Sequence, residues 1–226
     1  MDPITLKLLA GLLCSYLIGS LPTAFCFGKM TKGIDLRQHG SGNLGATNAF
    51  RVLGKGIGSV VLMLDILKGV TALLLAKGLF YDTGMQFSQD FYLCLAGIAV
   101  VSGHNWTVFL RFEGGKGVAT SLGVLIGFSV LIERFAWIVV MELVLWLVLF
   151  LVSGYVSLAS VVCSLMLPFF GIFLHLPKEI TAFLLFMAIL SLIRHKSNIL
   201  RLLQKKENHF KTRDFLKKLS RKTFSR

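Results

Sequence analysis

The 226-residue chain has little of what soluble proteins use most, which is charge. Only 15% of its residues are charged, against roughly 25% in ordinary soluble domains. By contrast, 55% of the residues are hydrophobic and 19 are phenylalanine. A hydrocarbon layer ~30 Å thick needs about 20 apolar residues per helix, so the long uncharged runs are typical of membrane spans. The scarcity of charge therefore predicts an integral membrane protein.

Cysteines and clustered acidic residues are scarce as well. The four cysteines are scattered through apolar stretches without a C-x-x-C pair, which excludes a disulfide framework and a zinc site. The 11 acidic residues include only isolated aspartates, whereas a transferase that uses a nucleotide-lipid and Mg²⁺ would need clustered ones. We therefore expect neither a metal nor a cofactor.

Seven apolar stretches are candidates for membrane helices, at residues 4–27, 57–80, 91–110, 118–132, 135–152, 155–176 and 180–193. The fourth is short, and only Ser153 and Gly154 separate the fifth from the sixth, so five or six spans are alternatives. The N-terminus lacks the basic region and cleavage site of a secretory signal, so the first stretch is expected to remain as a span. The sequence predicts an all-α membrane protein with about seven transmembrane helices.

Positive charge predicts the orientation of these helices. Residues 194–226 hold half of the 24 lysines and arginines, and basic segments stay on the cytoplasmic side. With the basic segments 28–56 and 111–117 on that side too, seven spans place the N-terminus outside and the C-terminus in the cytoplasm. We expect a polytopic membrane domain at 1–208 and a basic tail at 209–226. Without a soluble module, nucleic-acid binding is not expected.

The same alternation brings the polar stretches to one face of the membrane. They are residues 37–55, 103–117, 153–160 and 194–208, each at a predicted cytoplasmic helix end. We therefore expect them to converge on one site at the inner interface.

The first polar stretch contains GSGNLGATN at residues 40–48, a match to the dinucleotide fingerprint G-x-G-x-x-G. That fingerprint has meaning only between a strand and a helix, and here a membrane helix precedes it. Glycines let backbone N–H groups form a concave nest for an anion. We interpret the stretch as a phosphate cradle, with a plain surface loop as the alternative; its candidate ligands are Arg37, Ser41, Gly42, Asn43, Thr47, Asn48 and Arg51.

The second polar stretch places Lys116 among Gly114, Gly115 and Gly117, just before a predicted helix. It is no Walker loop, because no Ser or Thr follows the lysine. A helix N-terminus nevertheless favours an anion, so Lys116 is a candidate phosphate ligand, and a topology-setting lysine is the alternative. His104 lies at the end of the preceding span and is a further candidate.

Two further groups carry polar chemistry. Asp65 and Lys68 are three residues apart and share a helix face inside a span, either as a self-neutralising pair or as part of the site. His195 and Asn198 share a face of the last helix, where an amphipathic lipid-surface helix is the alternative. The spacing from His209 to Asp214 matches an acyltransferase signature, but it falls in the charged tail and is dismissed.

Taken together, these motifs resemble the bacterial acyl-phosphate:glycerol-3-phosphate acyltransferase family. The resemblance runs over about residues 16–208, through IGSLP, DLRQHGSGNLGATNAFRVLGK, DILKG, FLRFEGGKGVATSLG, YVSLAS and RHKSNILRLL. It implies transfer of an acyl group from acyl-phosphate to the 1-position of glycerol 3-phosphate at the cytoplasmic face of a bacterial inner membrane, without metal or acyl-CoA. Partners implied are these two substrates, anionic lipid and functional coupling to the enzyme that makes acyl-phosphate.

The resemblance also assigns residues. The catalytic candidates are Lys116, His195, Asn198 and His104, while Lys68, Gly115 and Glu207 join the phosphate-binding candidates. Departures from the family pattern are Thr107 for a frequent proline, Gly154 for a frequent basic residue, Lys196 for an arginine and Lys205 for a glycine. Lysine lacks the bidentate geometry of arginine, so a phosphate contact at position 196 is in doubt.

The residues favour direct attack by the glycerol hydroxyl, since an acyl-phosphate is already activated and no Ser-His-Asp arrangement occurs. The base is His195, His104 or a substrate phosphate oxygen. A transporter of a phosphorylated metabolite is the alternative function; it would place polar groups near the bilayer midplane and usually show a paired repeat, and no repeat is visible.

The predicted topology can be tested by cysteine labelling. Cysteines introduced at Ser41 and Thr212 should react from the cytoplasmic side, and one at Thr83 from outside, because the basic segments remain in the cytoplasm. Labelling of positions 41 and 212 from opposite sides would contradict the seven-span topology.

Overall fold

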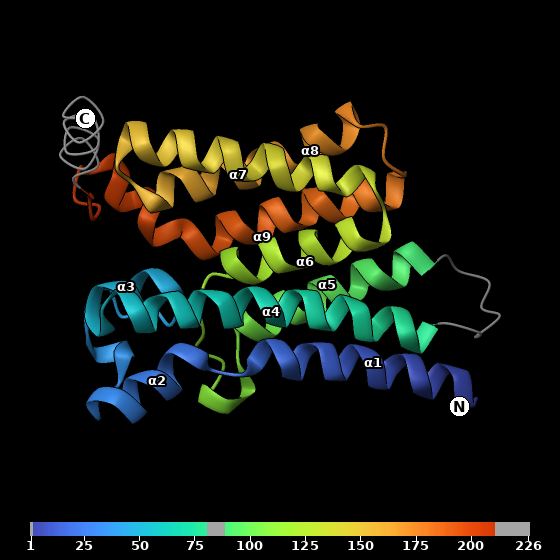
Figure 1. The fold of residues 1–226 in the computed structure, drawn as a ribbon, viewed down its shortest axis with the longest axis horizontal. Helices are drawn as coiled ribbons and strands as arrows, with labels where there is room; N and C mark the ends of the chain where they lie inside the picture. Colours follow the sequence, from blue (N-terminus) through green and yellow to red (C-terminus); the bar gives the residue numbers. More distant parts are fainter. Residues whose placement is uncertain (1, 81–88, 211–226) are drawn as a thin grey trace, which may run out of the picture.

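The computed structural model describes residues 2–80 and 89–210, and this part of the chain contains helices and loops but no β-strand (Figure 1). The α-helices are α1 (Pro3–Ser20), α2 (Thr23–Lys32), α3 (Ala46–Leu53), α4 (Lys55–Phe80), α5 (Gln89–Asn105), α6 (Val118–Leu131), α7 (Arg134–Ser153), α8 (Val156–Phe173) and α9 (Lys178–Leu203). Two 3₁₀ turns, η1 (Leu36–Gln38) and η2 (Val108–Leu110), lie in the connections. The predicted all-α fold is confirmed.

Six segments of the described chain are long and apolar enough to cross a membrane: Pro3–Lys32, Lys55–Leu79, Gln89–Leu110, Arg134–Ser153, Val156–Phe173 and Lys178–Leu203. Helix α6 has only 14 residues, a rise of about 21 Å against ~30 Å of hydrocarbon. The seventh span and the sidedness of the termini therefore remain predictions. Of the three labelling positions, Thr83 and Thr212 lie outside the described residues.

The first apolar stretch is two helices rather than one. Helix α1 ends at Ser20 and α2 begins at Thr23, with Leu21 in a non-helical conformation (φ −55°, ψ 115°). Pro22 has no N–H to donate, and its ring disfavours the helical conformation of the residue before it. The break leaves the Leu21 carbonyl available to a side chain, and it accepts a hydrogen bond from Lys68 Nζ at 2.6 Å.

Helices α4 and α6 pack side by side at the centre of the fold (Figure 1). Their backbones approach closely at Gly69 and Gly123, since a Cβ at position 123 would lie 1.9 Å from the Ile66 carbonyl oxygen. Small residues at such crossings are typical of membrane helix packing. Helix α1 packs on α4 and α5, while α8 packs on α7 and α9.

The polar stretches gather at one end of this bundle, on the left of Figure 1, where α3, the end of α7 and the end of α9 lie. Contacts between them establish the convergence: Arg37 with Glu113, Lys116 with Asn198, and Ser157 with Glu207. The predicted meeting of the four stretches is confirmed.

Candidate functional site

The centre of the site is Lys116, in the loop before α6. Its ammonium group donates to Asn198 Oδ1 on α9. Burial lowers the pKa of Lys116 to about 8. The charge of Glu207 acts in the opposite direction, and three guanidinium groups lower the pKa further: Arg201, Arg194 and Arg51. Lys116 is thus a partly buried cation surrounded by other cations, an arrangement suited to an anionic ligand.

The two glycines before Lys116 pack against His104 at the end of α5. Gly115 N donates to the His104 carbonyl oxygen at 2.9 Å. A Cβ at position 115 would lie 2.1 Å from His104 Nε2, and one at position 114 would lie 2.2 Å from the His104 carbonyl oxygen. Only glycine allows the loop to lie this close to the helix end.

Arg194 fixes the same loop from the side of α9. Its guanidinium donates to the carbonyl oxygens of Gly115 (2.6 Å from Nη2) and Gly114 (3.3 Å), and it lies 5.2 Å from the centre of the Trp106 ring. The sequence analysis did not select Arg194, although it is the residue directly before His195. The signal that could have found it was its position: Arg194 is a basic residue directly before His195, which shares a helix face with Asn198.

Glu207 determines which way the Asn198 amide points. Its carboxylate accepts from Asn198 Nδ2 and from Arg201 Nε, both at 2.7 Å, and from Ser157 Oγ at 3.1 Å. An ionised carboxylate can only accept, so the Asn198 oxygen must face Lys116. Burial acts to raise the pKa of Glu207, but the hydrogen bonds from Arg201 and Asn198 outweigh it and the pKa lies below its ordinary value. Glu207 therefore orients a neighbour of Lys116, and Ser157 is a second contributor that the sequence analysis missed.

His195 lies one helical turn before Asn198 and is 3% exposed. Its Nδ1 is 2.9 Å from the Ser191 carbonyl oxygen. A carbonyl cannot donate, so this contact assigns the proton to Nδ1 and leaves a lone pair on Nε2. The neutral ring can then accept a proton at Nε2.

The loop at residues 35–48 is shaped mainly by Asn48, which is 1% exposed. Its Oδ1 accepts from Ser41 N at 2.8 Å, and its Nδ2 donates to the His39 carbonyl oxygen at 3.0 Å. Asn43 Oδ1 accepts from Gly45 N at 2.9 Å, and Gly42 has a φ of +71° that favours glycine. The side chains of Asn43 and Asn48 thus hold the loop in shape, while the side chains of Thr47 and Arg51 form no hydrogen bond within the described residues.

Arg37 links this loop to the Lys116 loop. Its guanidinium pairs with Asp35 at 2.7 Å and with Glu113 at 2.9 Å. The hydrogen bonds from Arg37 hold the pKa of Asp35 below its ordinary value. Arg37 lies at the same end of the molecule as Lys116, but its charge already has two carboxylate partners.

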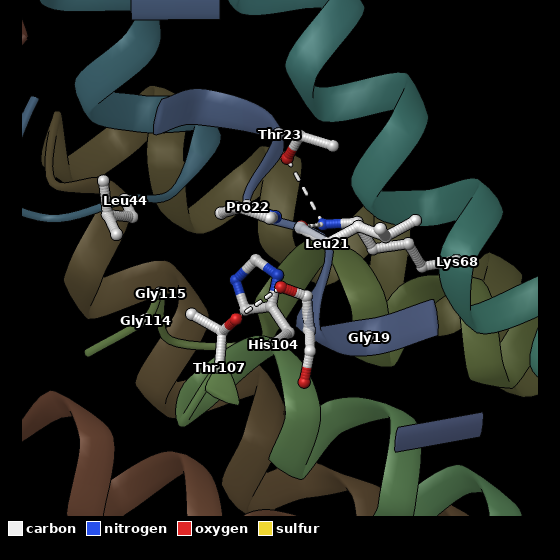
Figure 2. A pocket seen from close by; sticks show the side chains of 11 residues that line it. Gly19, Leu21, Pro22, Thr23, Leu44, Lys68, His104, Thr107, Gly114 and Gly115 are labelled. Carbon is white, nitrogen blue, oxygen red and sulfur yellow. Dashed lines mark hydrogen bonds between the residues drawn. The ribbon is translucent and has the colours of Figure 1, made fainter. Parts of the chain in front are cut away.

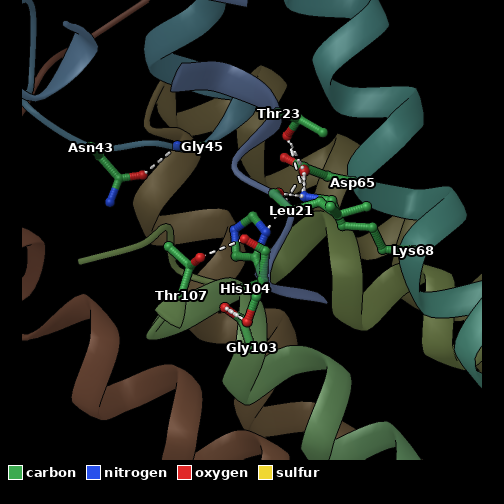
Figure 3. A network of polar contacts seen from close by, with 10 residues as sticks. Leu21, Thr23, Asn43, Gly45, Asp65, Lys68, Gly103, His104 and Thr107 are labelled. Atoms are coloured by element: carbon green, nitrogen blue, oxygen red, sulfur yellow. Dashed lines mark hydrogen bonds and ion pairs between the residues drawn. The ribbon is translucent and has the colours of Figure 1, made fainter. Parts of the chain in front are cut away.

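A second polar cluster lies between α4, α5 and the α1–α2 break (Figure 3). Lys68 Nζ donates to Asp65 Oδ1 (2.7 Å), to the Leu21 carbonyl oxygen (2.6 Å) and to Thr23 Oγ1 (3.3 Å). These contacts use the three N–H bonds of an ammonium group. Asp65 Oδ1 also accepts from Thr23 Oγ1 at 2.7 Å, and His104 Nδ1 is 3.7 Å from it.

This cluster borders a small cavity of about 10 Å³ (Figure 2), roughly the room that one water molecule needs. The cavity is lined by Gly19, Ser20, Leu21, Pro22, Thr23, Leu44, Lys68, His104, Thr107, Gly114 and Gly115. Gly114 and Gly115 thus face the cavity, while the next residue, Lys116, contacts α9. The structure brings Lys116, Asn198, His195 and Glu207 together and places His104 and Lys68 in this adjoining cluster.

Comparison with known proteins identifies the family. The family model for glycerol-3-phosphate acyltransferase matches residues 9–205. A glycerol-3-phosphate acyltransferase of Thermoanaerobacter sp. is 43% identical over 189 residues, covering 84% of this chain and 88% of the relative. One from Desulforudis audaxviator is 39% identical over 213 residues, covering 94% and 100%.

Solved structures agree with these relatives. The glycerol 3-phosphate form of PlsY, an integral membrane glycerol 3-phosphate acyltransferase, superposes with a TM-score of 0.81 at 37% identity, over 92% of this chain and 98% of that one. Its lysophosphatidic acid form gives a TM-score of 0.79 at 36% identity, with the same coverage. Together with the apolar helices, these matches make the chain a multi-pass membrane protein.

The Asp65–Lys68 pair gives a testable prediction about the second cluster. Asp65 is fully buried and Lys68 is 5% exposed, so Lys68→Met should leave an unpaired buried carboxylate and destabilise the protein by about 3–5 kcal/mol. The double variant Asp65→Asn/Lys68→Met should recover most of the loss, measured as the Tm in detergent. A Lys68→Met protein as stable as the wild type would show that the pair does not stabilise the fold.

Proposed function

Because the chain belongs to the glycerol-3-phosphate acyltransferase family, we propose that it transfers a fatty acyl group from acyl-phosphate to the 1-position of glycerol 3-phosphate. The products are 1-acyl-glycerol 3-phosphate and phosphate. This reaction would be the first step of phospholipid synthesis.

The observation that carries the proposal is the environment of Lys116. Lys116 is flanked in the chain by three glycines just before α6, its ammonium contacts Asn198, and Arg51, Arg194 and Arg201 are near enough to affect its pKa. Two substrate phosphates bring roughly three to four negative charges. A cluster of buried cations is unfavourable by itself, and phosphate would relieve the repulsion within it.

The proposed binding groups differ in whether they already form an ion pair. Lys116 and Arg51 form no ion pair within the described residues, so they are the main phosphate ligands in this proposal. Arg37 and Lys68 already have carboxylate partners, which would have to give way before either residue binds phosphate.

We propose that the loop at residues 40–48 cradles one of the two phosphates next to Lys116. The binding groups in this proposal are the side chains of Ser41, Asn43 and Thr47. The candidates Gly42, Asn48 and Gly115 would shape the two loops instead, because Asn48 is bonded within its own loop and the amides of Gly42 and Gly115 already donate to the carbonyl oxygens of His39 and His104. Glu207 enters as a positioning residue that acts through Asn198, since a carboxylate repels phosphate.

In the proposed reaction, the C1 hydroxyl oxygen of glycerol 3-phosphate attacks the acyl carbon of the acyl-phosphate. The bond from that carbon to the phosphate oxygen breaks, and phosphate leaves without a covalent enzyme intermediate. Orientation of the two substrates can supply roughly 7–11 kcal/mol of the barrier. Each donor aimed at the developing oxyanion can add about 3–4 kcal/mol, and Lys116 and Asn198 are the candidates.

The hydroxyl proton passes to His195, His104 or a substrate phosphate oxygen. The hydrogen bond from His195 Nδ1 to the Ser191 carbonyl favours His195, because it leaves Nε2 free to accept the proton. His104 lies against Gly115 and 3.7 Å from Asp65, and it enters the proposal as the second candidate.

We also propose that the site faces the cytoplasm at a bacterial inner membrane, with α6 as a short seventh span. The tail at 209–226 would bind anionic lipid through its basic residues. The boundary at 208 remains a prediction, and His209 and Phe210 in fact contact the bundle. Functional coupling to the enzyme that makes acyl-phosphate belongs to the same proposal.

The proposed reaction can be tested with purified protein and competing donors. Acyl-phosphate should give 1-acyl-glycerol 3-phosphate, also in EDTA, while acyl-CoA and acyl carrier protein should not. Labelled acyl-phosphate without glycerol 3-phosphate should leave no label on the protein, since the transfer is direct. Preferential use of a thioester donor would refute the proposed donor, and a competent acyl-enzyme would refute direct attack.

The role of Lys116 gives a sharper prediction. Lys116→Ala should lower kcat/KM about 100- to 5,000-fold, the result of losing a phosphate contact of roughly 3–5 kcal/mol, whereas Lys116→Arg should keep partial activity. With a pKa of about 8, the ammonium is charged below that pH, so kcat/KM should fall as the pH rises through 8. In Lys116→Arg the fall should move to higher pH, because guanidinium stays protonated.

The matched control is Lys29→Ala, which removes an exposed basic residue at the end of α2 and should leave kcat/KM unchanged. If Lys116 only sets the topology, correctly inserted Lys116→Ala would turn over normally. A fall below about tenfold would remove Lys116 from the proposed site.

A further inference from the structure

The seven residues after α9 do not leave the bundle but turn back onto the junction of α7 and α8. We call Gln204–Phe210 the strap; it is the red segment at the left of Figure 1. Phe210 N donates to the Gly154 carbonyl oxygen at 2.9 Å. The strap is thus hydrogen-bonded at its far end to the turn that precedes α8.

Two aromatic contacts add to this hydrogen bond. The His209 ring meets the Tyr155 ring edge-on, with centroids 5.0 Å apart. The Phe210 ring meets Phe150 in the same manner at 5.8 Å. Edge-to-face pairs at these distances are favourable, so the last two strap residues have a defined docking place.

Gly154 is the residue that makes room for the strap. Its φ of +73° favours glycine. A Cβ there would also lie 2.4 Å from His209 Nε2 and 2.6 Å from the Phe210 carbonyl oxygen. Any larger residue at position 154 must therefore displace His209 and Phe210.

The start of the strap is strained. Lys205 adopts a left-handed conformation with a φ of +56°, which is unfavourable for a residue other than glycine. Its N–H donates to the Leu202 carbonyl oxygen, and Lys206 N donates to that of Arg201. The reversal at Lys205 directs the chain back toward α8 and brings the Glu207 carboxylate into contact with Asn198.

We propose that the strap is a positioning device for the site: docking of His209 and Phe210 on Gly154 and Tyr155 holds Glu207 against Asn198, and thereby Asn198 against Lys116. The assignment of a catalytic consequence rests on the function proposed above. His209, Phe210 and Gly154 touch no substrate in this proposal and act only through Glu207.

The strap also affects the charge balance at Lys116. The charged groups that influence it are Glu207, Arg201, Arg194 and Arg51, and His195 lies on the same face of α9. Among the groups named, only Glu207 is negative, so it favours the protonated ammonium. Release of the strap should therefore lower the pKa of Lys116 and move the alkaline fall of kcat/KM to lower pH.

The experiment uses Phe210→Ala and Gly154→Ala in the full-length protein. Hydrogen–deuterium exchange of the peptide spanning 204–210 reports docking without reference to activity, and exchange should be fast in both variants. We expect kcat/KM to fall about tenfold to a hundredfold, the scale of a misplaced site group. The fall of kcat/KM at alkaline pH should also begin at a lower pH than in the wild type. Phe210→Leu keeps the backbone hydrogen bond and a large apolar side chain. In this variant, exchange of the strap should be slow again and kcat/KM should return to most of the wild-type value.

Two matched controls separate positioning from general damage. Gly33→Ala places a Cβ at a φ of +67° with nothing within 4 Å, so it carries the same backbone strain without touching the strap. Phe173→Ala removes an aromatic ring that is 72% exposed at the far end of α8. Neither should change the exchange of the strap or the pH profile.

The proposal is overturned if exchange in the strap becomes fast while kcat/KM and its pH profile stay at the wild-type values. It is also overturned if the wild-type strap already exchanges as fast as in Phe210→Ala. If Gly154→Ala does not fold, the exchange and the kcat/KM of Phe210→Ala test the proposal without it. Absence of acyl transfer by the wild type would instead refute the proposed function, and the exchange data would still show whether the strap docks.

Discussion

The contact between Lys116 and Asn198 is the interaction on which the rest of the site depends. It joins the loop before α6 to α9, two segments separated by 82 positions in the sequence. Arg194 strengthens the same connection through the carbonyl oxygens of Gly114 and Gly115. Because the loop has no regular structure of its own, its geometry is determined by its contacts with α9 and with His104 at the end of α5. The position of the ammonium is therefore a property of the pairing between two elements.

Charge is handled in two different ways within this small region. At Asp65 and Lys68, opposite charges are paired and the ammonium group has three acceptors, which is how a buried charge becomes tolerable. Around Lys116, the charged groups that affect its pKa within the described residues are three arginines and one carboxylate, that of Glu207. The first arrangement satisfies the Lys68 ammonium, although Asp65 Oδ2 is buried without a hydrogen-bond partner in the described part of the chain. The second is the one that, in the function proposed above, an anion would stabilise. This contrast is the reason that the proposed function assigns phosphate binding to the residues around Lys116 rather than to Lys68.

Hydrogen-bond donors and acceptors show what each candidate side chain is bonded to, which the residue type alone does not show. Glu207 resembled a substrate ligand in sequence, but its carboxylate accepts from Asn198, Arg201 and Ser157. Asn48 resembled a phosphate donor, yet its amide is engaged with the backbone of its own loop. Both side chains thus hold neighbouring groups of the candidate site in place. A sequence motif shows that such residues occur together, but it does not show which of them faces the ligand.

The sequence by itself determined that this is an all-α membrane protein with polar segments at one end, because apolar length and the placement of charge are properties of the linear chain. It also contained the motifs that identify the family. It did not reveal the break at Pro22, the engagement of Lys68 with the carbonyl that this break releases, or the loop contact of Arg194. Those depend on which side chains meet across helices, and hydrogen-bond partners are selected by distances between remote segments. The tertiary structure alone decided them, since a donor bonds with the acceptor that packing brings within about 3 Å of it.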